Sequence, residues 1–232
     1  MPPGAVAALA SASLLTLAAV PGGGPPLPAR MADTGGGTQL IVARAASTSS
    51  TTGTLTWWDR RRGTWVRAGS APARFGSAGL TEGGTRRQGT NTTPTGLYGL
   101  PFAFGLRRAP GGTDVPYRRV RQDSWWCQDN RSRSYNRWTE PRPADCRAAE
   151  AEHLASYATP YAYALVIGFN YDRPVRGRGA GVFLHVNGRG ATAGCVSVPR
   201  DTMRRLLAWA DPRRSPHIAI GTASGGTAVT RY

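Results

Sequence analysis

One histidine and one cysteine near the end of the chain have the types and spacing of a base and a thiol nucleophile. His185 and Cys195 each lie in an apolar run typical of a strand, and a glycine-rich segment joins the two runs. A cysteine thiol has a pKa of about 8.5, so attack on a carbonyl at neutral pH needs a nearby base. If the runs pair as an antiparallel hairpin, both side chains meet on one face. The imidazole would then take the thiol proton or form a thiolate–imidazolium pair.

The joining segment also suits stabilisation of an oxyanion. Its glycines leave backbone amides unshielded, and we expect the amides of Gly194 and Cys195 to point at the developing oxygen. One such donor typically contributes about 3 to 4 kcal/mol in the transition state. We expect Thr192 to hydrogen-bond within the turn or to orient the substrate. No acidic or amide residue stands out as a third member, so the carbonyl of Val186 is a candidate to orient the imidazole.

Structural and metal-binding roles compete with catalysis for these residues. A buried histidine beside a strand cysteine is often structural, and the glycines also fit a tight hairpin. A zinc site would need three or four ligands, and His153, His217, Cys127 and Cys146 show no metal-ligand spacing. The sequence therefore predicts neither a metal nor a cofactor.

The three cysteines indicate one disulfide and one free thiol, with three pairings open. Cys127 and Cys146 share one polar segment, residues 122–149. A bridge between them closes a loop of about 20 residues and contributes about 3 kcal/mol in the chain-entropy model. This pairing leaves Cys195 free to act as a nucleophile.

The N-terminus predicts export. Residues 5–20 are apolar and uncharged and are followed by glycine and proline, although the first four residues lack the usual basic side chain. The run is short for a membrane span, which needs about 20 apolar residues. We expect a signal peptide or N-terminal anchor plus linker over residues 1–32, one folded domain over residues 38–225, and no other transmembrane segment.

The net charge of +16 predicts adhesion to anionic surfaces outside the cell, such as cell-wall polymers. All 29 basic residues are arginines, against 13 acidic residues. They are spread along the chain rather than clustered, which argues against a nucleic-acid partner.

The predicted elements form a mainly β domain with one or two short helices. Strands are expected at residues 39–43, 54–59, 63–68, 162–169, 181–186, 195–198 and 217–221. Residues 201–210 have the apolar stripe of a helix, with Asp201 as its N-cap, and residues 148–157 suit a second, short helix. The tryptophan-rich residues 118–142 have no clear period and are expected to form a long loop or flap.

Several ordered motifs resemble the catalytic domain of L,D-transpeptidases, the YkuD type. They are Gly-Val-Phe-Leu-His-Val at 181–186, Ala-Gly-Cys-Val at 193–196, Thr-Pro-Thr-Gly-Leu-Tyr at 93–98, the apolar run at 163–171, and Ser-Tyr-Asn-Arg-Trp at 134–138. The last of these is similar to a segment of exported relatives from high-GC Gram-positive bacteria. The resemblance extends from about residue 39 to residue 221.

The resemblance implies a β-sandwich-like fold and a two-step acyl transfer on peptidoglycan stem peptides. Cys195 would be the acylated nucleophile and His185 its base, Gly194 and Cys195 would supply oxyanion amides, and Thr192 would match the family's Ser/Thr position. The donor would be a tetrapeptide stem cut between the L-centre of meso-diaminopimelate and D-alanine. The acceptor would be the side-chain amine of a second stem, which gives a 3→3 cross-link.

The chain departs from the commonest family pattern at two positions. That pattern has histidine before the glycine–cysteine pair and asparagine two residues after it, where this chain has Ala193 and Ser197. These changes leave the thiol chemistry intact and bear on substrate and acceptor choice. Water as acceptor, giving an L,D-carboxypeptidase or amidase, and a non-catalytic basic binding protein remain the alternatives.

Overall fold

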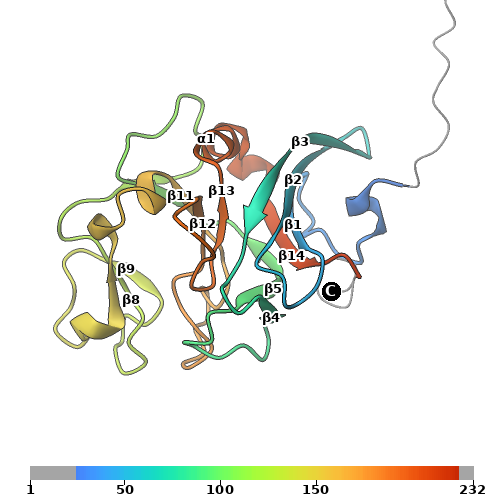
Figure 1. The fold of residues 1–232 in the computed structure, drawn as a ribbon. Coiled ribbons are helices and arrows are strands. Elements are labelled where there is room, and N and C mark those ends of the chain that lie inside the picture. The colour runs from blue at the N-terminus through green and yellow to red at the C-terminus, as the bar shows by residue number, and fades with distance from the viewer. Residues whose placement is uncertain (1–24, 225–232) are drawn as a thin grey trace, which may run out of the picture.

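The computed structural model describes residues 25–224, which form a mainly β fold around one large sheet (Figure 1). Its strands are β1 (Gln39–Ala45), β2 (Thr52–Arg61), β3 (Thr64–Arg74), β4 (Leu80–Glu82), β5 (Thr93–Gly99), β6 (Ala103–Gly105), β7 (Tyr117–Arg119), β8 (Trp125–Cys127), β9 (Arg137–Thr139), β10 (Ala151–His153), β11 (Ala164–Val166), β12 (Phe183–Val186), β13 (Val196–Val198) and β14 (His217–Thr222). The helices are α1 (Arg200–Trp209) and the short 3-10 turns η1 (Leu27–Arg30), η2 (Ala148–Glu150), η3 (Leu154–Ser156), η4 (Pro160–Ala162) and η5 (Pro212–Arg214). The predicted fold class is confirmed.

The large sheet has two halves that share one core. Its 11 strands run in the order β4-β5-β14-β1-β2-β3-β13-β12-β11-β6-β7, and its halves meet where Ser197 of β13 pairs with Arg74 of β3. Ile41 from one half and Leu165 and Leu184 from the other are fully buried in the same apolar cluster. Burial of both inner faces against each other gives the sandwich-like arrangement that the sequence predicts.

Helix α1 follows β13 and closes the same core. Met203, Leu206 and Leu207 are fully buried in it. The prediction that Asp201 caps this helix is wrong, because Pro199 occupies the N-cap position and the carboxylate lies inside the first turn. An acidic side chain in the first turn still complements the positive end of the helix dipole.

A second, three-stranded sheet, β10-β8-β9, forms where the sequence predicts a loop and a short helix. Residues 118–142 contain β8 and β9 rather than forming only a loop, and residues 148–157 form β10 between two 3-10 turns rather than a helix. Trp126 of β8 is 1% exposed and stacks on Phe102. Glu152 of β10 pairs with Trp126 in register, and this pairing overrides the helix propensity of the alanine- and glutamate-rich segment.

The described part of the N-terminal segment packs against the domain. Leu27 and Met31 contact the apolar cluster around Leu40, so the end of the predicted linker packs against the domain. The predicted signal, residues 5–20, lies outside the described residues. Between residues 25 and 224 no helix is long and apolar enough to cross a membrane.

Candidate active site

The two strands that carry the predicted nucleophile and base are parallel neighbours, not an antiparallel hairpin. In the register of β12 and β13, His185 pairs with Ser197, so Cys195 lies two positions earlier on the same face as the histidine. The connecting loop bonds instead to the segment after β3 through its backbone. The Thr192 carbonyl accepts from the Ser77 N–H at 2.8 Å, and the Thr192 N–H donates to the Phe75 carbonyl at 2.8 Å. Because of these bonds the loop runs back to the start of β12 before β13 begins. His185 and Cys195 therefore still lie on one face, although the two strands are parallel and not antiparallel.

His185 is held as a neutral base with one free nitrogen. Nδ1 of His185 lies 2.8 Å from the Val186 carbonyl oxygen. Because that oxygen can only accept, Nδ1 donates, and the lone pair of Nε2 is left free. The residue is 7% exposed, and burial lowers its pKa to about 4, against the opposing effect of the bond to Val186. The Tyr161 and His185 rings pack nearly at right angles, with their centroids 5.7 Å apart. A neutral, oriented imidazole at pH 7 can accept a proton.

Cys195 is a free, partly exposed thiol that is protonated at rest. Burial is the main cause that raises its pKa to about 12, and the charge of Glu152 adds to it. The Phe183 N–H donates to Sγ at 3.3 Å, and Sγ lies 3.5 Å from the Gly181 carbonyl. With the thiol and the imidazole both neutral, the structure does not favour a resting thiolate–imidazolium pair, and a thiol proton would have to transfer during an attack.

Thr192 and Gly194 brace the loop before Cys195. The Thr192 hydroxyl donates to the Cys195 carbonyl at 2.6 Å and accepts from the Gly194 N–H at 3.2 Å. In this structure the Gly194 amide, expected as an oxyanion donor, therefore serves the loop itself. Gly194 has φ +134°, and a Cβ there would lie 2.8 Å from Nη2 of Arg86, so the position needs glycine.

The two positions that depart from the family pattern lie in different surroundings. Ala193 lines the pocket in front of the thiol. Ser197 is buried, and its hydroxyl donates to Oδ1 of Asn187 at 2.8 Å, so it fixes the start of the loop. Of the two, Ala193 is placed to affect what the pocket accepts.

A pocket of about 510 Å³ collects four of the predicted site residues: His185, Thr192, Gly194 and Cys195. Val186 contributes through its carbonyl from behind the histidine. The pocket is also lined by Arg86, Gln128, Glu152 and Tyr161, which sequence reasoning missed. These residues come from segments 34 to 109 residues away from Cys195 and follow no motif, so only the tertiary structure identifies them.

Glu152 is partly buried and places its carboxyl in the pocket. It accepts hydrogen bonds from the Tyr161 hydroxyl and, at 3.1 Å, from Nε2 of Gln128. Burial raises its pKa to about 7, and the two hydrogen bonds oppose that rise. The carboxyl therefore changes charge near neutral pH, close enough to Cys195 to affect the thiol.

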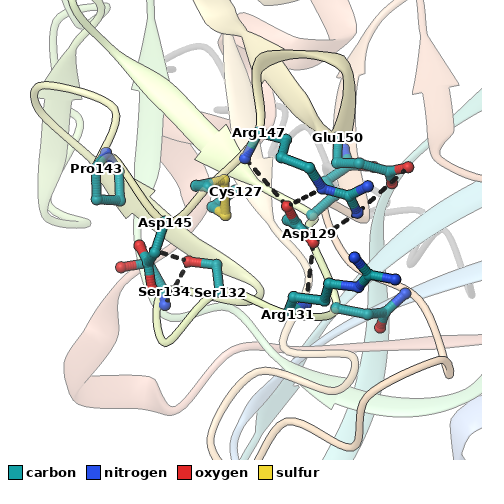
Figure 2. A network of polar contacts seen from close by, with 12 residues as sticks. Cys127, Asp129, Arg131, Ser132, Ser134, Pro143, Asp145, Arg147 and Glu150 are labelled. Carbon is teal, nitrogen blue, oxygen red and sulfur yellow. Dashed lines mark hydrogen bonds and ion pairs between the residues drawn. A yellow bond between two sulfur atoms is a disulfide. The ribbon is translucent and has the colours of Figure 1, made fainter.

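The second sheet and the disulfide hold this wall of the pocket. Cys127 and Cys146 are bonded, as predicted. Figure 2 shows the disulfide beside Asp129, whose buried carboxylate accepts from Nε of Arg147 at 2.7 Å and from its backbone N–H at 3.0 Å. This ion pair holds the pKa of Asp129 well below its usual range. The wall is thus an ordered part of the domain that presents Glu152 to the thiol.

Comparison with known proteins agrees with this geometry. The family model for the L,D-transpeptidase catalytic domain, YkuD, matches residues 44–222, which include His185 and Cys195. No curated protein matches the chain. Among solved structures it is similar to Bd1075 of Bdellovibrio bacteriovorus, with a TM-score of 0.41, 17% sequence identity, and coverage of 79% of this chain and 48% of that chain. The chain thus spans about half the length of Bd1075, and the assignment rests on the family model. The match over most of the domain shows that this chain belongs to the L,D-transpeptidase catalytic domain family.

Proposed function

We propose that the chain is an exported cysteine L,D-transpeptidase that joins peptidoglycan stem peptides by 3→3 cross-links. One observation carries the proposal: a free Cys195 thiol and a neutral His185, whose Nε2 has no hydrogen-bond partner among residues 25–224, share one face of one pocket in a member of this family. A non-catalytic binding protein would have no need for this pairing.

The first step transfers an acyl group to sulfur. His185 Nε2 takes the thiol proton while Sγ of Cys195 bonds to the carbonyl carbon of the L-centre of meso-diaminopimelate in the donor stem. The bond from that carbon to the nitrogen of D-alanine breaks, and the imidazolium returns the proton to the leaving amine. In the second step an amine of another stem attacks the thioester, gives up a proton through His185, and Sγ leaves as the thiol.

The test is acylation of the purified protein. Incubation with a carbapenem should add one acyl mass, which Cys195→Ala abolishes and which His185→Gln greatly slows. With sacculi as substrate, 3→3 dimers should form. Tripeptide stems without dimers would show hydrolysis instead, and an unmodified protein with no new muropeptides would sink the enzymatic proposal.

The proposed location is outside the cytoplasm, against the cell wall. The Cys127–Cys146 disulfide suits an oxidising compartment, and the net charge of +16 suits anionic wall polymers as partners. Cell fractionation should place the protein in the wall fraction, and about 1 M salt should release it because such contacts are screened. Recovery in the cytosol with reduced cysteines would contradict this.

A further inference from the structure

Arg86 is a buried cation that no carboxylate of the described chain neutralises. It is 7% exposed, its Nε donates to the Thr92 carbonyl at 2.8 Å, and its Nη1 donates to the Arg178 carbonyl at 3.2 Å. None of the ion pairs within residues 25–224 includes it. A buried charge is costly unless an opposite charge or strong hydrogen bonds compensate it. The two carbonyls fix the guanidinium but leave its Nη2 hydrogens without an acceptor among the described residues.

The unused nitrogen lies beside the nucleophile. Nη2 would be 2.8 Å from a Cβ built on Gly194, the residue before Cys195, and Arg86 lines the same pocket. An acidic residue that also lines the pocket, Glu152, has its two oxygens bonded to Tyr161 and Gln128. The pocket therefore offers an anion a fixed cationic partner next to the sulfur.

We infer that Arg86 binds the free α-carboxylate of the amino acid that leaves the donor stem. This inference rests on the proposed function, in which the leaving residue is the C-terminal one. Its carboxylate carbon is then three bonds from the carbonyl carbon that Sγ attacks. A carboxylate so close to the reacting atom must lie beside the nucleophile, where Nη2 is. Guanidinium–carboxylate hydrogen bonds are short and strong, and they would direct cleavage to the last peptide bond of a stem.

The test compares two donors that differ only at this carboxylate. The donors are a tetrapeptide stem and the same stem with a C-terminal amide, and the readout is the second-order rate of Cys195 acylation by mass spectrometry. Wild type should prefer the acid by about 10- to 100-fold, the effect of losing one charge-assisted hydrogen bond. Arg86→Gln should lose most of this preference, so that its acid-to-amide rate ratio falls toward one. Arg86→Lys should keep part of it.

Arg87→Gln is the matched control, since it removes the same charge from the adjacent, exposed residue. Its acid-to-amide ratio should equal that of wild type. If Arg86→Gln slows both donors equally, the guanidinium supports the oxyanion or the fold, and the inference is wrong. The wild-type ratio needs no variant to fold: equal rates on acid and amide would overturn the inference while leaving the proposed function intact. No acylation by either donor would overturn both.

Discussion

Replacing Glu152 by glutamine should change how the stability of the protein depends on pH. In the wild type the Glu152 carboxyl accepts from Tyr161 and Gln128, and burial raises its pKa from 4.5 to about 7. Glutamine has nearly the same shape and carries no charge. Its oxygen can still accept from Tyr161, while the side-chain amide of Gln128 must rotate to present its own oxygen to the new NH₂ group.

The sign and size of the effect follow from the raised pKa. The Glu152 carboxyl binds its proton more tightly in the folded state than in the unfolded state. It therefore stabilises the fold fully below about pH 4.5, and this stabilisation is lost as the pH rises through about 7. At about 1.4 kcal/mol per pH unit, that interval amounts to about 3 kcal/mol of unfolding free energy. Glu152→Gln should not show this loss, so its stability relative to wild type should rise with pH.

Urea unfolding of both proteins between about pH 5 and pH 8.5, with the disulfide intact and tryptophan fluorescence as the signal, measures the difference. Glu150→Gln is the matched control, because that side chain is 42% exposed and two residues away. Its difference from wild type reports the loss of one exposed negative charge on the same segment. If the free-energy difference between wild type and Glu152→Gln is the same at both ends of the pH range, the reasoning from burial fails.

Three further outcomes are expected. Alkylation of Cys195 by iodoacetamide in the resting enzyme should keep rising from about pH 7 to pH 9, because burial raises the thiol pKa to about 12; a plateau near pH 7 would indicate a preformed thiolate. Thr192→Ala should slow carbapenem acylation and cost about 1 kcal/mol in urea unfolding, since it removes the bonds to the Cys195 carbonyl and the Gly194 amide, and Thr192→Ser should restore both values. Reduction of the Cys127–Cys146 bridge, which spans 19 positions, should lower the unfolding free energy by about 3 kcal/mol, and equal urea midpoints with and without reductant would contradict this.

The parts of the site that the sequence predicts are those that neighbouring residues determine. His185 and its orienting carbonyl at Val186 are adjacent in one strand, and alternation along that strand fixes the face of the imidazole. The disulfide joins Cys127 and Cys146 within one polar segment, where short loop closure favours the pairing. Thr192 and Gly194 form their hydrogen bonds within a few residues of Cys195.

The parts that the sequence does not predict depend on distant pairings. The loop before Cys195 bonds to residues 75–77, more than a hundred positions earlier, and this contact makes β12 and β13 parallel. Glu152 lies in a segment whose composition favours a helix, and only pairing with β8 extends it toward the pocket. Arg86 is one of 29 basic residues, and nothing in its local sequence separates a buried guanidinium from an exposed one.

The pKa values of the reacting pair decide how the thiol is activated. In a stable thiolate–imidazolium pair the histidine must be the stronger base, yet burial places the pKa of His185 at about 4 and that of Cys195 at about 12. In the proposed mechanism the proton therefore leaves sulfur only as the new bond to the carbonyl carbon forms, and Nε2 must be in position at that moment. The bond from Nδ1 to the Val186 carbonyl holds the ring in place before the substrate arrives. Activation of the thiol would then depend on the orientation of the imidazole, whereas other cysteine sites depend on a lowered thiol pKa.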